Sequence, residues 1–115
     1  MAAQTDPAQL VRQARDLIEE CNRVVLDAEE LSAPALSETV QALKSLVGRL
    51  PQAFEQTAYV MTRLAADNKI TMEQGDPMSE AATTAAELRT VAVHCQQLAK
   101  ELSNPASALF LMGGR

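Results

Sequence analysis

The fold is decided by residues 36–64, which read LSETVQALKSLVGRLPQAFEQTAYVMTRL. Apolar side chains recur here in alternating steps of four and three residues, the spacing of a continuous stripe along one side of an α-helix. The stripe has one polar member and consists of Leu36, Val40, Leu43, Val47, Leu50, Phe54, Thr57, Met61 and Leu64. Further apolar residues at Leu46, Ala53 and Val60 widen it. The pattern predicts a long amphipathic helix, wide-striped enough to contact more than one neighbour in a bundle.

Pro51 lies inside this stripe. An internal proline costs about 3 kcal/mol and usually kinks or breaks a helix, and Gly48 weakens the same turn. The stripe nevertheless keeps its phase across Pro51, which two independent helices would have no reason to do. The pattern therefore favours one helix over residues 34–67, kinked at Pro51. The alternative is a true break at Pro51, which would give a four-helix arrangement.

Two further stripes with the same alternation predict two more long helices. The first covers residues 7–31 and begins at Asp6-Pro7, a capping residue followed by a proline at the first helical position. Its stripe is Leu10, Ala14, Leu17, Cys21, Val24, Ala28 and Leu31. The other covers residues 77–103 and begins at Asp76-Pro77 in the same way. Its stripe is Met78, Ala81, Ala85, Leu88, Ala92, Cys95, Ala99 and Leu102, with Val91 and Leu98 beside it.

A third cap-plus-proline pair, Asn104-Pro105, predicts a short final helix over residues 105–112 that stops at Gly113. The expected fold is thus all-α: an up-down bundle of three long helices plus a short C-terminal helix, in one domain over residues 1–115. Short connections make sequential helices antiparallel neighbours. Folding them back from their turns places Leu10 opposite roughly Gln56, and Leu102 opposite roughly Gln41.

The composition narrows the classes of function. Aromatic residues make up 3% of the 115 residues, so the core must be aliphatic, and the net charge of −5 argues against binding nucleic acid. No apolar run approaches the ~20 residues of a membrane span. The N-terminal residues lack the basic region followed by an apolar stretch that is typical of a signal peptide. We therefore expect a cytoplasmic protein with reduced cysteines.

The polar residues do not form a recognisable catalytic or metal-binding pattern. The single histidine is His94, and Val91 stands where a helical Glu-x-x-His metal motif requires Glu. Cys95 follows His94 directly, and adjacent helical side chains point about 100° apart, which is unsuitable for a nucleophile and its base. Both Cys21 and Cys95 occupy stripe positions, as small apolar core residues do. We expect no enzyme activity, no metal and no cofactor.

The segment Val93-His94-Cys95-Gln96-Gln97 resembles the acceptor segment of lactose-type sugar-transport phosphocarriers, which are trimers of three-helix subunits. That family continues with Asp-His-Leu, which this sequence lacks. His-containing phosphotransfer domains carry Lys and Gly at the third and fourth positions after the acceptor, where this chain has Gln97 and Leu98. The resemblance implies an alternative function, a histidine phosphocarrier-type bundle that uses His94.

An uncharged apolar cluster ends the chain, with Leu109, Phe110 and Met112 as its largest side chains. A monomer rarely leaves such a cluster exposed. It either covers the open end of the bundle or contacts another subunit or a partner protein. Ile70 and Met72, in the loop between the long helices, form a second candidate patch. The leading hypothesis is a non-enzymatic protein-protein interaction or oligomerisation module that forms a homodimer.

Overall fold

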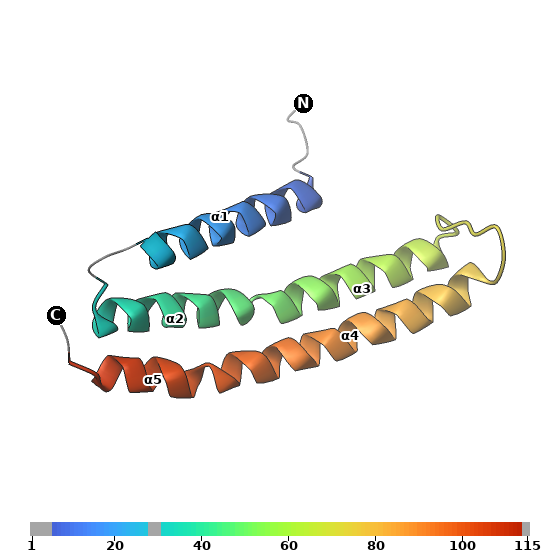
Figure 1. Cartoon of the computed structure of the whole chain (residues 1–115). Coiled ribbons are helices and arrows are strands. Elements are labelled where there is room, and N and C mark those ends of the chain that lie inside the picture. The colour runs from blue at the N-terminus through green and yellow to red at the C-terminus, as the bar shows by residue number, and fades with distance from the viewer. Residues whose placement is uncertain (1–5, 28–30, 114–115) are drawn as a thin grey trace, which may run out of the picture. The chain divides into compact units, whose positions relative to one another are not determined.

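The computed structural model describes residues 6–27 and 31–113, and every regular element in this part of the chain is an α-helix. The elements are α1 (Pro7–Asp27), α2 (Ala33–Val47), α3 (Leu50–Ala66), α4 (Pro77–Glu101) and α5 (Ser103–Leu111) (Figure 1). They divide into two compact units, one holding α1 and the other holding α2 to α5. The all-α class is confirmed. The single domain, and the packing of residue 10 opposite residue 56, stay predictions.

The unit that holds α1 begins as predicted. The side chain of Asp6 accepts a hydrogen bond from the Ala8 backbone N–H at 3.1 Å, and Pro7 takes the first helical position. The helix is shorter than predicted, because it ends at Asp27 and Leu31 lies outside any helix. The last turn carries Asp27 and no basic residue, and negative charge opposes the helix dipole there. The predicted stripe position at residue 28 lies outside the described residues.

The long central helix is interrupted at Gly48 and Arg49, three and two residues before the expected kink at Pro51. The Gly48 N–H still donates to the Lys44 carbonyl (2.9 Å), while the Arg49 N–H donates one residue short of the α-helical partner, to Leu46 (3.1 Å). Pro51 has no N–H to offer the Val47 carbonyl, so the regular ladder must stop a turn earlier. Pro51 then falls in the first turn of α3, where no N–H is needed. The structure therefore has the split form of this helix.

Helix α4 starts at the predicted residue, Pro77. The Asp76 side chain accepts a hydrogen bond from the Met78 N–H (3.3 Å) and caps α4, with Pro77 at its first position. The cap predicted at Asn104 was wrong, because α5 already begins at Ser103 and only Leu102 separates it from α4. Asn104 and Pro105 lie in the first turn of α5. Pro105 is tolerated there because first-turn N–H groups have no helical acceptor.

Helices α2 to α5 form a long hairpin (Figure 1). Helix α3 packs against α4 and α2 packs against α5, with the chain reversing direction in residues 67–76. Two residues of this loop adopt left-handed backbone conformations, Asn68 (φ 58°) and Gly75 (φ 92°). Asparagine and glycine tolerate this region best, so they suit the reversal.

The seam of the hairpin is lined by small side chains. The buried residues are Ser37, Pro51, Ala58, Ala65, Ala81, Ala85, Ala92 and Ala106. Apart from Ala81, the buried residues fall into two series in which neighbours are seven or fourteen positions apart: Ser37, Pro51, Ala58 and Ala65 on one strand, and Ala85, Ala92 and Ala106 on the other. Because of this spacing, each series keeps to one side of its helices. Small residues at these positions let the two backbones approach closely, and the larger apolar side chains are left beside the seam.

The register of the seam is fixed by a buried hydrogen bond. The Ser37 hydroxyl donates to the Ala106 backbone carbonyl at 3.0 Å. Moving four residues forward from Ser37 and four back from Ala106 pairs Gln41 with Leu102, which confirms the predicted register. The same antiparallel register places Pro51 level with Ala92, and Ala58 level with Ala85.

Replacing Ser37 by Ala tests this bond. The substitution removes a fully buried donor between α2 and α5 and should lower the free energy of unfolding by about 1 kcal/mol. Urea denaturation followed by circular dichroism measures the change. Ser45→Ala, on the exposed side of the same helix, is the matched control. Equal midpoints for both variants would contradict a stabilising role for the bond.

Candidate interaction surfaces

The C-terminal cluster does not form one continuous patch. Leu109 is half-buried, whereas Phe110 and Met112 are 69% and 51% exposed. Helix α5 ends at Leu111, and the Met112 N–H donates to the Leu109 carbonyl at 3.2 Å. On the other side of the seam an open hollow of about 400 Å³ is lined by Gln41, Ser107, Phe110 and Leu111.

The loop patch lies at the other end of the hairpin. Ile70 is half-buried and Met72 is exposed, both in the connection between α3 and α4. At ~1.5 Å per helical residue, the length of α4 and α5 puts this loop roughly 50 Å from the end of α5. The structure therefore does not bring the two predicted patches together, and each must act as a separate surface.

A third surface is formed on the hairpin by apolar residues that the sequence pattern placed within or beside two of the predicted stripes. Six large apolar side chains remain between 36% and 48% exposed, and we call them the apolar face: Leu46, Leu50, Val60, Leu64, Val91 and Leu98. Their positions relative to the buried series at Ala58 and Ala85 put all six on the same flank of the seam. The face thus runs along both strands of the hairpin.

The opposite flank of the seam is polar. The residues that follow the buried series by four positions are exposed, and they include Gln41, Glu55, Thr62, Arg89 and Gln96. Phe110 follows Ala106 by four positions and so belongs to this polar flank. The hairpin is therefore two-sided, with an apolar face on one flank and a polar flank that carries Phe110 at its end.

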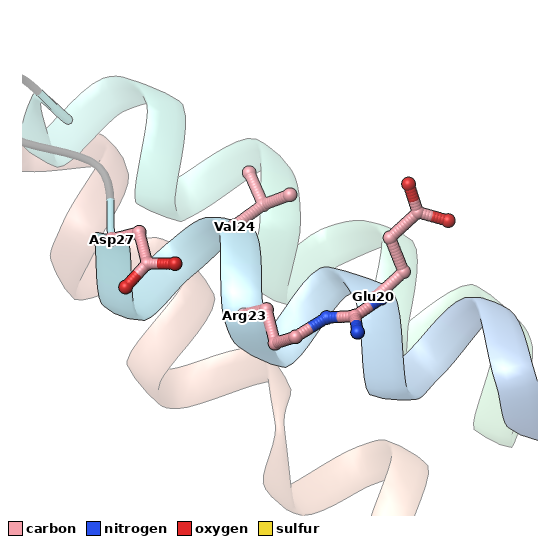
Figure 2. A pocket seen from close by; sticks show the side chains of 4 residues that line it. All are labelled: Glu20, Arg23, Val24 and Asp27. Atoms are coloured by element: carbon pink, nitrogen blue, oxygen red, sulfur yellow. The ribbon is translucent and has the colours of Figure 1, made fainter.

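Helix α1 carries a different kind of surface. An open hollow of about 420 Å³ runs along its last turns and is lined by Glu20, Arg23, Val24 and Asp27 (Figure 2). All four side chains come from the last two turns of the same helix, and each lies three or four residues from two of the others, so the hollow is part of the outer surface of α1. Taken by itself, the unit that holds α1 has one helix, which cannot bury its own apolar stripe.

Among the described residues, those considered for chemistry do not gather into a site. His94 is exposed on α4, and its neighbours one helical turn away, Thr90, Val91, Gln97 and Leu98, carry no charge. Cys21 and Cys95 are half-buried free thiols. Within residues 6–27 and 31–113, no group of three or more His, Cys, Asp or Glu side chains is arranged to hold a metal ion.

Comparisons with known proteins give no relative. No family model, curated protein or solved structure matches the chain. In the part of the chain that the structure describes, no helix combines the length and apolar character needed to cross a membrane. A function for the chain must therefore be argued from the surfaces of its helices.

Proposed function

We propose that the chain is a non-enzymatic protein-protein interaction module that forms a homodimer in the cytoplasm. The observation that carries the proposal is the apolar surface of the hairpin, where large aliphatic side chains on both strands stay exposed to solvent. Contiguous exposed apolar surface of this kind marks interaction sites in stable proteins. The two free thiols are consistent with a reducing compartment.

The seam supports the same proposal. Its buried side chains are mostly alanines, which bury little apolar area each, so the hairpin gains less from its own core than a leucine-lined seam would. Covering the larger side chains beside the seam would supply the missing burial. Association with another protein surface therefore stabilises the fold as well as serving a function.

The tail offers a separate contact for a protein partner, centred on Leu109, Phe110 and Met112. Phe110→Asp removes the largest exposed ring of this tail. Because the side chain is 69% exposed, we expect the free energy of unfolding to change by less than about 0.5 kcal/mol. A partner that co-purifies with the wild-type chain should be lost from the variant.

Ala108→Asp is the control for this experiment, since residue 108 is also exposed on α5. A variant that keeps its partner and only melts at a lower temperature would show that Phe110 belongs to the core. Ile70→Asp with Met72→Asp tests the loop patch in the same way.

A histidine phosphocarrier that uses His94 is the second candidate. The exposure of His94 on α4 favours it, because an acceptor ring must enter the active site of its phosphodonor. Incubation with a phosphodonor, followed by mass spectrometry of the chain and of His94→Ala, tests this function. A phosphoryl mass increase in the wild-type chain alone would support it, and an unchanged mass would exclude that donor.

A further inference from the structure

We propose that two copies of this chain associate through the apolar face, with each α3 lying antiparallel to α4 of the other copy and the twofold axis parallel to the helices. This arrangement rests on the homodimer proposed above and specifies its interface. It makes a four-helix core from two hairpins. The argument has three parts: the size of the face, the charges along its edges, and the height at which those charges lie.

The apolar face supplies the centre of a dimer interface. On the longer of its two stretches it extends from Leu46 to Leu64, roughly 27 Å at ~1.5 Å per residue, and two adjacent helices are roughly 20 Å wide. The resulting area, on the order of 500 Å², compares with about 800 Å² per partner in a standard stable interface. The residues along the edges of the face must therefore supply the rest of the contact area.

The two edges of the face carry opposite charges. On the α3 side, the next positions around the helix hold Arg49 and Arg63. On the α4 side, the seven-residue series beside the face holds Glu80, Glu87, His94 and Glu101. The whole width of the apolar face separates these two edges within one chain, so they cannot neutralise each other there.

The arrangement of charge selects the direction of the symmetry axis. A twofold axis that lies in the interface and runs parallel to the helices brings the basic edge of one copy against the acidic edge of the other. An axis across the helices brings like charges together, which costs affinity. Rotation about an axis parallel to the helices leaves every residue at the same position along the length of the hairpin. Within one copy, the register set by Ser37 and Ala106 puts Arg63 level with Glu80. Arg63 of one copy thus lies level with Glu80 of the other, and pairing with it turns the Arg63 guanidinium away from the Tyr59 ring of its own helix, whose centroid is 5.7 Å away.

The first test compares two valines on α4. Val91 lies in the apolar face, whereas Val93 points to the far side of the same helix and is also exposed. Val91→Glu puts a charge in the proposed interface and should raise the dimer Kd by at least about 100-fold. Val93→Glu makes the same chemical change outside the interface and should alter the Kd less than about threefold. Sedimentation equilibrium of the full chain measures both constants.

The second test reverses the paired charges. Arg63→Glu and Glu80→Arg should each raise the Kd roughly tenfold, because symmetry places two like-charged contacts in each dimer. The double variant should return to within about threefold of the wild-type value. Arg89→Glu, on the polar flank, is the control for an equal change of net charge. Circular dichroism checks that each variant keeps its helices.

The outcomes separate this interface from the proposed function. A wild-type chain that is monomeric throughout overturns the homodimer and the interface together. A dimer that Val91→Glu does not weaken overturns the interface alone. If Val91→Glu lowers the melting temperature more than Val93→Glu while the mass stays unchanged, another part of the same chain covers the face, which also overturns the interface. A dimer weakened by Val91→Glu but without charge rescue overturns the direction of the axis.

Discussion

Replacing Ala85 by Leu is expected to lower the free energy of unfolding by about 3 kcal/mol, because the seam has no room for a larger side chain. Ala85 is 1% exposed, and the register places it level with Ala58, which is fully buried. Three extra carbon atoms at this buried position would force α3 and α4 apart. Urea denaturation followed by circular dichroism gives the free energy.

Ala86→Leu is the matched control, since residue 86 is exposed on the same helix. It should change the free energy of unfolding by less than about 0.5 kcal/mol. If both variants unfold at the same urea concentration, the close packing of alanines at this seam is refuted.

Replacing Ala106 by Asp should open one half of the hairpin. Ala106 is 5% exposed on α5, and its carbonyl accepts the Ser37 hydroxyl of α2. A carboxylate buried there without a partner costs about 3 kcal/mol. Because α2 packs against α5 while α3 packs against α4, the loss should concentrate in α2 and α5.

Hydrogen exchange read by mass spectrometry resolves this pattern. Amide protons of α2 and α5 should exchange faster in Ala106→Asp, while those in the middle of α3 and α4 stay protected. Ala108→Asp, on the exposed side of α5, should leave the wild-type pattern. Uniform loss of protection in all four helices would instead mean that the hairpin unfolds as one unit.

The sequence predicted the helices well where local chemistry decides them. Asp6-Pro7 and Asp76-Pro77 start their helices at the predicted residues because a capping side chain and a proline act within one turn. Folding the helices back from the loop at residues 67–76 also predicted the register between the strands, which the Ser37–Ala106 hydrogen bond confirms. Pro51 was predicted to kink or split the central helix, and the split lies just before it at Gly48 and Arg49, because a proline leaves the carbonyl four residues earlier without a donor.

The surfaces were harder to predict than the helices. Periodicity identifies which residues are apolar, but it does not say which of them the seam will bury. Here the seam buries alanines such as Ala58 and Ala92, whereas Leu98 lies beside the seam and stays exposed. Apolar residues that the pattern assigned to the core therefore form part of an exposed face. The tail was expected to act as one patch, yet consecutive helical residues point about 100° apart, which puts Leu109 at the seam and Phe110 on the polar flank.

The most direct test of the central claim is the mass of the wild-type chain in solution. One chain has a mass of 12.4 kDa. Size-exclusion chromatography with light scattering at micromolar concentrations should give twice that value. A mass of one chain at every concentration in this range would contradict self-association through the apolar face.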